Sequence, residues 1–227
     1  MGNVLMLKRK ERRRRKVRVL FLKIILGIAI AIGMILFLKQ MYLAEEKEAV
    51  SWKESGAGMW ESGVIPGKMP VFFQYDTRWK DEKYGDGTME FNGCGPTCLS
   101  MVLCELRKTE KWNPLTVARQ ADEWGYYAKG AGSLWTLMSE GAEKLGLTVH
   151  TVCFDESHIR QELLEERPII CVMRPGEFTT TGHFIVLCEL DEDGRVIIRD
   201  PNSEERSRKT WELQELMPQI KNLWSYS

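Results

Sequence analysis

The chain has 227 residues, and its 32 Lys and Arg residues balance 32 Asp and Glu residues, so the formal net charge is zero. The charges are unevenly distributed, because residues 1–18 hold nine basic residues and one acidic residue, whereas residues 40–227 hold 21 basic and 31 acidic residues. An acidic region of this size argues against a nucleic-acid partner held by general electrostatics, and its length predicts a single folded domain.

An apolar segment at 19–39 contains only two charges, both of them lysines. Twenty of its residues would span about 30 Å as a helix, which matches the hydrocarbon core of a membrane. Basic residues precede it and acidic residues follow it, so the positive-inside rule predicts a cytoplasmic tail at 1–18, a transmembrane signal anchor at 19–39 and an extracellular remainder. A cleaved signal peptide is the alternative interpretation. We interpret 40–66 as a stalk or linker and 67–227 as the folded domain.

The first part of the folded domain has the pattern of helices and loops. Residues 71–75 are predicted to form a short strand or an extended segment, and residues 76–93 a loop that contains several glycines. Apolar residues then recur with helical spacing, Pro96 suits a first helical turn, and Ser133 is a good N-cap residue. The predicted helices extend from about 95 to 107, from 113 to 124 and from 133 to 145.

The second part of the domain has the pattern of strands. Apolar and β-branched residues predominate in short runs, and the sequence Asp191-Glu192-Asp193-Gly194 predicts a hairpin between the last two runs. Helices that precede an antiparallel sheet predict an α+β fold. The predicted strands are 147–154, 169–173, 183–190 and 195–199, and a short helix is predicted at 157–167.

Cys94 stands at the start of the first predicted helix, between Gly93 and Gly95. The N-terminal end of a helix carries partial positive charge, which favours the thiolate form of a cysteine. The two small neighbours are expected to leave space for a substrate. We therefore predict that Cys94 is a nucleophile rather than a buried structural cysteine.

A nucleophilic cysteine needs a base, and His183 at the start of a predicted strand is the candidate. If Leu190 pairs with Arg195 across the hairpin, His183 stands opposite Asn202 and shares a face with Asp200. Asp200 is then expected to orient the imidazole, and Asn202 is the alternative. In such a triad the base removes the thiol proton while the third group fixes the ring.

The other cysteines and histidines are interpreted as structural. Outside the cell disulfides are permitted, so the pairing of Cys98, Cys104, Cys153, Cys171 and Cys188 stays open, although buried free thiols are favoured for most of them. A strained Cys94–Cys98 disulfide and a zinc site of these two cysteines with His183 are the weaker alternatives, and we expect no metal and no cofactor. His150 and His158 are interpreted as packing or surface residues.

Several short motifs occur in a fixed order: Gln74 with Tyr75-Asp76-Thr77-Arg78-Trp79, Tyr84-Gly85, Asn92-Gly93-Cys94-Gly95-Pro96-Thr97, Gly182-His183-Phe184-Ile185-Val186 and Arg199-Asp200-Pro201-Asn202. Together they resemble the C39-like cysteine peptidases, which are stand-alone relatives of the leader-processing peptidase domains of bacteriocin exporters. The resemblance covers residues from about 70 to 205. It suggests a bacterial origin.

The resemblance implies a papain-like fold and a role for each motif residue. Cys94 would be the nucleophile, His183 the general base and acid, and Asp200 the orienting carboxylate. Gln74 resembles the oxyanion-hole glutamine, whose side-chain N–H would act together with the Cys94 backbone N–H. Exporter-type domains place that glutamine only a few residues before the cysteine, whereas here twenty residues separate Gln74 from Cys94.

We therefore predict a single-pass cell-membrane protein whose extracellular domain is a cysteine peptidase. Its substrate would be a peptide or protein, including one linked to peptidoglycan. Loops at 76–92, 125–135 and 174–182 are expected to form the pocket walls. A cell-wall amidase or transacylase on the same fold is one alternative, and a non-catalytic surface binding module is another. The sequence leaves specificity, activation and oligomeric state open.

Overall fold

The computed structural model describes residues 23, 27, 30, 32–37, 39–40 and 67–227. The chain divides into two compact units, at 1–57 and 58–227, and the second contains the predicted folded domain. The predicted cytoplasmic tail, much of the predicted anchor and nearly all of the predicted stalk lie outside the described residues. Within the part of the chain that is described, no helix combines the length and the apolar character that crossing a membrane requires.

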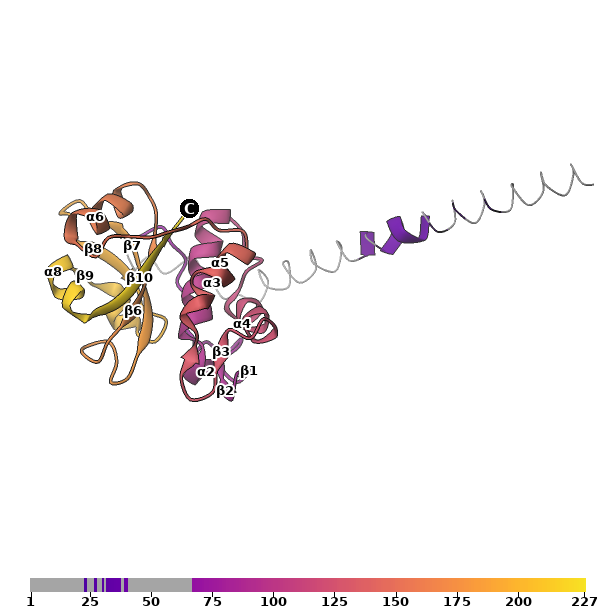
Figure 1. Ribbon diagram of the computed structural model, residues 1–227, viewed down its shortest axis with the longest axis horizontal. Coiled ribbons are helices and arrows are strands. Elements are labelled where there is room, and N and C mark those ends of the chain that lie inside the picture. The colour runs from indigo at the N-terminus through magenta and orange to yellow at the C-terminus, as the bar shows by residue number, and fades with distance from the viewer. Residues whose placement is uncertain (1–22, 24–26, 28–29, 31, 38, 41–66) are drawn as a thin grey trace, which may run out of the picture. The chain divides into compact units, whose positions relative to one another are not determined.

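The second unit consists of a helical half, up to α5, and a sheet half, from β5 onward (Figure 1). Its elements in chain order are β1 (Lys83–Tyr84), β2 (Gly87–Thr88), α2 (Met89–Asn92), α3 (Cys94–Arg107), α4 (Pro114–Glu123), β3 (Tyr127–Ala128), β4 (Gly132–Ser133), η1 (Trp135–Leu137), α5 (Glu140–Lys144), β5 (Val149–His150), α6 (Glu156–Leu164), β6 (Ile169–Met173), β7 (His183–Leu190), β8 (Val196–Arg199), α7 (Glu204–Arg208), β9 (Thr210–Trp211), α8 (Leu213–Leu216), η2 (Met217–Gln219) and β10 (Ile220–Tyr226).

Six strands form one antiparallel sheet in the order β5-β10-β6-β7-β8-β9. Strand β6 is buried along its whole length, and the C-terminal strand β10 pairs with β6 on one side and β5 on the other. Apolar side chains of α6, α8 and the central strands form a buried cluster on the sheet. This mixed α/β architecture with an antiparallel sheet agrees with the predicted order of helices followed by strands.

Helix α3 and strand β7 bring the two halves together, because they contact each other directly (Figure 1). Every residue of α3 from Gly95 to Cys104 is buried, so the helix is enclosed on all sides over its first turns. The hydroxyl of Tyr226 in β10 donates to the backbone carbonyl of Met138, 2.8 Å away, and gives a second connection between the halves. The start of α3 is therefore held in a fixed position beside the sheet.

The elements with strong local signals agree with the predictions. Helices α3 and α4 begin and end within one residue of the predicted bounds. Pro114 takes the first position of α4, and the side chain of Asn113 accepts a hydrogen bond from the Thr116 N–H at 3.0 Å. Strands β6, β7 and β8 also match, since their apolar runs are long enough to specify buried strands.

Three predictions were wrong in detail. Ser133 does not cap a helix: its Oγ lies 2.7 Å from the Tyr84 hydroxyl, and the residues after it form the short η1 and α5 instead of one helix. The predicted strand at 147–154 is reduced to β5, whereas residues 71–75, which we predicted to form a short strand or an extended segment, contain no strand in the described structure. Part of the loop predicted at 76–93 is the β1–β2 hairpin with α2.

Candidate active site

Cys94 is the first residue of α3, and its side chain is partly exposed. The fourteen-residue helix places the partial positive charge of its N-terminus at this sulfur. Hydrogen bonding to the backbone of Gly95 and of Phe184 also lowers the pKa of Cys94, so both α3 and β7 contribute to its environment. These groups stabilise a thiolate at this position.

The two positions beside Cys94 have no room for a side chain, because protein atoms lie against both glycines. A Cβ atom on Gly95 would lie 2.5 Å from the Ser133 Oγ, and one on Gly93 would lie 2.4 Å from the Met89 backbone oxygen. Both distances are well below van der Waals contact. We expected the two glycines to leave space for a substrate, but close packing of the helix start explains both of them.

Gly95→Ala is expected to lower the free energy of unfolding by about 1–3 kcal/mol, because the new methyl group must displace Ser133. Urea unfolding followed by circular dichroism would measure the change. Gly182→Ala is the matched control, since nothing lies within 4 Å of the added Cβ there. Equal effects of the two substitutions would contradict the packing explanation.

The register of the β7–β8 hairpin differs from the prediction at the turn. Leu190 pairs with Val196, whereas we predicted that it would pair with Arg195. Arg195 belongs to the turn instead, because its carbonyl accepts a hydrogen bond from the Asp191 N–H at 2.8 Å. A one-residue shift moves side chains to the other face of the partner strand, so this register alone would separate the predicted base from its carboxylate.

A β-bulge in β7 reverses this shift. The bulge adds one residue, Cys188, to β7, and beyond it Val186 pairs with Arg199. With that register Asp200, directly after β8, shares the face of His183. The imidazole Nε2 and the carboxylate Oδ1 are 2.7 Å apart. The predicted pairing of His183 with Asp200 is therefore present, although a bulge that we did not predict produces it.

Asp200 is almost fully buried, and hydrogen bonds hold both of its carboxylate oxygens. Oδ1 accepts from His183 and from the Asn202 backbone N–H at 2.8 Å, while Oδ2 accepts from the Arg206 Nε at 2.5 Å. Burial alone would raise the pKa of Asp200, but the bonds and charges of His183 and Arg206 lower it. The Asn202 side chain is exposed, so the carboxylate, and not this amide, contacts the histidine.

Cys94 and His183 have pKa values displaced in opposite directions. Burial favours the thiol, but the hydrogen bond and charge of His183 outweigh it and lower the pKa of Cys94. Burial likewise opposes the imidazolium, yet hydrogen bonds to Asp200 and Cys94 raise the pKa of His183 to about 9. Since Nε2 faces Asp200, Nδ1 is the ring nitrogen available to Cys94. The two side chains therefore favour a thiolate–imidazolium pair at neutral pH.

These directions predict a bell-shaped pH profile of kcat/KM for any reaction that needs this ion pair. The rate should rise as Cys94 loses its proton at a pH below the ordinary thiol pKa, and it should fall near pH 9 as His183 loses its proton. Steady-state assays between pH 4 and pH 11 would check both limbs. An alkaline limb near the ordinary histidine pKa of 6.5 would contradict the coupling.

Four other cysteines are chemically unlike Cys94. All six cysteines are free thiols in the structure, and burial raises the pKa of the four that are buried, Cys98, Cys104, Cys171 and Cys188. The expectation of buried free thiols therefore holds for these four, whereas Cys153 is exposed. His150 bonds to Ser227 and His158 to Asp155, and neither contact involves a residue of the triad.

Gln74 is buried but does not line the cleft described below. Its backbone N–H donates to the carbonyl of Pro201 at 2.9 Å, which ties it to the segment that follows Asp200. Its side-chain Nε2 donates to the carbonyl of Glu90 at 2.5 Å, and its Oε1 has no hydrogen-bond partner among residues 67–227. A glutamine Nε2 has two N–H groups, so this contact leaves one of them for another acceptor.

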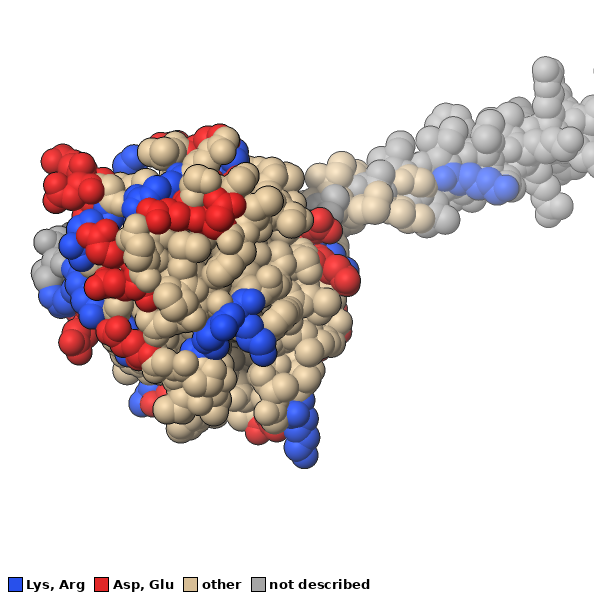
Figure 2. Space-filling view, turned by 60° about the vertical axis from the view of Figure 1, so that its left-hand side comes forward, with Lys and Arg blue, Asp and Glu red and all other residues tan. Residues whose placement is uncertain are grey.

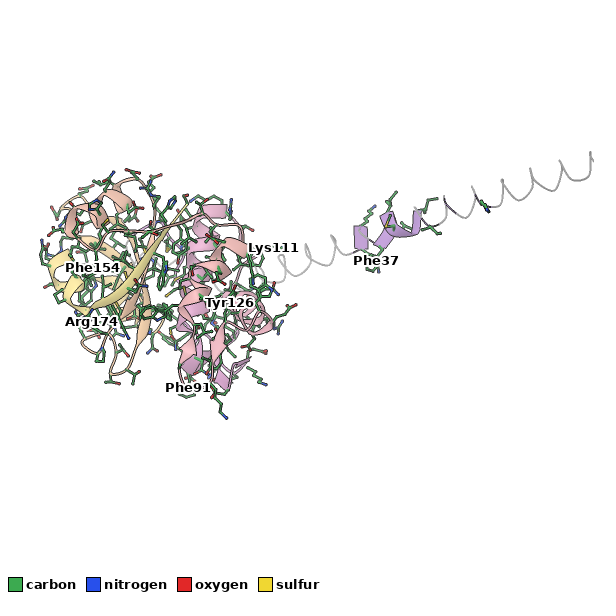
Figure 3. All side chains as sticks on the ribbon, viewed as in Figure 1. Phe37, Phe91, Lys111, Tyr126, Phe154 and Arg174 are labelled. Atoms are coloured by element: carbon green, nitrogen blue, oxygen red, sulfur yellow. The ribbon has the colours of Figure 1, made fainter. Side chains whose placement is uncertain are left out.

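Cys94 and His183 lie in one cleft of about 740 Å³ between the two halves. All three predicted wall regions contribute to it, and Figure 3 shows Phe91 at the end of the helical half and Arg174 on the sheet half. We did not predict the contribution of β10, which comes through Lys221. The wall residues are Asp86, Phe91, Asn92, Tyr127, Gly130 to Ser133, Trp135, Val172 to Pro175, Thr181, Gly182, Phe184 and Lys221.

Arg206 is the site residue that the sequence did not reveal. It lies in the five-residue helix α7, where Ser203 caps the first turn, and its guanidinium also stands over the Phe178 ring, 5.6 Å from the centroid. Nothing in the sequence around it distinguishes it from its neighbour Arg208, which pairs with Glu204 at the surface. Only the folded position of α7 shows that Arg206 holds the carboxylate of Asp200.

The arrangement can be compared with known families. No curated protein matches this chain. One protein family does match residues 68–227, from the segment before Gln74 to the C-terminus. The matched region includes Cys94, His183 and Asp200. Because this match covers most of the sequence, the chain belongs to the Peptidase C39 like family.

Proposed function

We propose that this protein is a cysteine peptidase that uses Cys94, His183 and Asp200 to hydrolyse peptide bonds. One observation carries the proposal: the buried imidazole of His183 is hydrogen-bonded to Asp200 and lines, together with Cys94, one cleft large enough for several peptide residues. Membership of the Peptidase C39 like family supports the same reaction. A papain-like fold and an extracellular domain on a membrane anchor remain parts of the proposal.

The reaction would begin when the Cys94 thiolate attacks the carbonyl carbon of the scissile peptide bond. A carbon–sulfur bond forms, and the imidazolium of His183 gives its proton to the leaving amine as the carbon–nitrogen bond breaks. The now neutral His183 removes a proton from water, which attacks the thioester and releases the acid. The carboxylate of Asp200 would fix the ring throughout and stabilise its charged form.

An oxyanion forms at the substrate carbonyl during both steps and requires hydrogen-bond donors. The backbone N–H of Cys94 lies in the first turn of α3, where N–H groups lack helical partners. We propose that the remaining N–H of Gln74 is the second donor. Its bonds to Glu90 and Pro201 would hold the amide in place for this role.

Turnover of defined substrates by the full-length chain tests the proposal. A mixture of peptides and, separately, soluble peptidoglycan fragments would be incubated with the protein and with Cys94→Ala, and the products read by mass spectrometry. Peptides with new amino and carboxyl termini, absent with Cys94→Ala, are expected. Products joined to an added amine would identify a transacylase. Equal results for both proteins on every substrate would contradict an enzyme and favour a binding module.

A further inference from the structure

Two cations line the cleft that contains Cys94 and His183, and the proposed chemistry uses neither of them. Arg174 directly follows β6, and Lys221 lies in β10. Both side chains are exposed, and within residues 67–227 neither one forms an ion pair. Two unpaired cations in one cleft are available to a ligand.

Several other cations of the sheet half have acidic partners. Lys209 pairs with Glu177 at 3.1 Å, and Arg195 pairs with Glu212 at 3.2 Å. In the face shown in Figure 2, red and blue side chains intermingle on one side, whereas a blue group stands within a mainly uncharged area. The one carboxylate among the described cleft-lining residues, Asp86, accepts a hydrogen bond from the Tyr127 hydroxyl.

A β-bulge in β10 accounts for the position of Lys221 in the cleft. Ile220 and Asn222 pair with the consecutive residues Met173 and Val172 of β6, so Lys221 is the extra residue of a β-bulge. A bulge interrupts the alternation of side chains and redirects the residue that it inserts. Strand β10 can therefore present a lysine at the cleft without exposing the buried residues beside it.

Arg174 is fixed next to this bulge. Its backbone N–H donates to the carbonyl of Gln219 at 2.8 Å, and its Nη2 donates to the carbonyl of Ile220 at 2.9 Å. One nitrogen of the guanidinium thus holds it beside the residue that precedes Lys221, and within residues 67–227 its remaining N–H groups have no acceptor, so they can bind a ligand. A guanidinium with several donors suits a planar carboxylate.

The backbone of Arg174 lies close to His183. Met173 pairs with His183 across β6 and β7, and Arg174 is the next residue along β6. Its Cα is therefore within roughly 9 Å of the His183 Cα. Since an extended peptide rises about 3.3 Å per residue, a group bound here would be two or three residues from the scissile bond.

An indole ring forms the apolar part of this wall. Trp135 packs edge-to-face on Trp224 with 6.1 Å between ring centroids, so residues of both halves hold it. The Lys221 ammonium stands over the Trp135 ring at 5.3 Å from the centroid. The aliphatic stem of an acidic side chain would contact the ring while its carboxylate meets the cations.

We propose that Arg174 and Lys221 form a subsite for a carboxylate of the substrate, two or three residues from the cleaved bond. This inference rests on the proposed peptidase function and names its substrate class: peptides with an acidic group at that position. The carboxylate would belong either to an Asp or Glu side chain or to the C-terminus of a short peptide. Both sources offer the same two oxygens to the same two cations.

Matched peptides test the subsite in the full-length chain. Each would carry Glu, Gln or Lys at the second or third position on either side of the cleaved bond, and each would be made with a free and with an amidated C-terminus. We expect kcat/KM to be about tenfold or more higher for Glu than for Gln at one position. If the C-terminus is the recognised group, amidation will instead cause the loss, and Glu will equal Gln.

Substitutions assign the preference to the two cations. The double variant Arg174→Gln/Lys221→Gln is expected to abolish the preference for the acid, and Lys221→Glu to shift it toward Lys. Lys144→Glu is the matched control, because Lys144 is also exposed and also stands over aromatic rings, but lies outside the cleft. It should leave the preference unchanged. Raised salt should weaken the preference, since both cations are exposed.

Binding to the inactive Cys94→Ala chain separates this inference from the proposed function. Fluorescence anisotropy would compare the Glu and Gln peptides, and a tenfold lower Kd for the acid supports the subsite even if no peptide is cleaved. Wild-type protein that cleaves and binds acidic, neutral and amidated peptides equally would overturn the inference while leaving the peptidase intact. A preference that survives in the double variant would overturn it as well.

Discussion

Replacing His183 by alanine is expected to reduce kcat/KM for peptide hydrolysis by about 10³-fold or more. The imidazole is the group that both bonds to the Cys94 sulfur and lowers its pKa, so its loss removes the thiolate and the proton donor together. Asp200 keeps its bonds to Asn202 and Arg206, so the fold should persist. Steady-state kinetics and circular dichroism would measure the two effects.

His150→Ala is the matched control for this substitution. His150 also lies in a strand of the same sheet, but its ring bonds to the Ser227 hydroxyl at 2.9 Å and does not line the cleft. Activity should remain within about twofold of the wild type. A similar loss of activity in both variants would indicate general damage to the sheet, and full activity of His183→Ala would exclude His183 as the base.

Asp200→Ala is expected to impair both stability and activity. The substitution removes a buried carboxylate that accepts three hydrogen bonds, and it leaves Arg206 without its acidic partner. Breaking a buried ion pair from one side costs about 3–5 kcal/mol, and losing an orienting carboxylate costs up to about 10⁴ in rate. Urea unfolding would measure the free energy of unfolding, and kinetics would measure kcat/KM.

Arg206 provides the comparison that separates these two effects. Arg206→Ala should lower stability but retain most of the activity near neutral pH, because Asp200 still contacts His183. In a double-mutant cycle the two substitutions should be strongly non-additive for stability, since each removes the same contact. Additive losses, or a loss of activity in Arg206→Ala equal to that in Asp200→Ala, would contradict this division of roles.

The hairpin shows how a correct site prediction can rest on an incorrect register. Prediction of the turn alone placed Leu190 opposite Arg195, whereas in the structure Leu190 pairs with Val196, one residue further along. The bulge at Cys188 compensates within β7, so Asp200 still reaches His183. Bulges depend on packing between strands and carry little local signal, which is why sequence patterns predicted the partners but not the path between them.

Long-range contacts account for the elements that the sequence did not predict. Serine is a preferred residue at the start of a helix, but the Ser133 hydroxyl bonds to Tyr84, 49 residues earlier. Strand β10 pairs with β6, which lies more than forty residues before it, and its bulge supplies Lys221 to the cleft. By contrast α3 carries its own signals in Pro96 and a periodic apolar run, and its bounds agree with prediction.

Alkylation of Cys94 by iodoacetamide at pH 7 tests the central claim most directly. Peptide mass spectrometry of the full-length protein would follow Cys94 and Cys153 together, since exposed Cys153 is an internal reference and the other four thiols are buried. An activated pair predicts that Cys94 reacts about tenfold or more faster than Cys153, and that this excess disappears in His183→Ala. Equal rates at the two cysteines, unaffected by His183→Ala, would contradict a catalytic thiolate at Cys94.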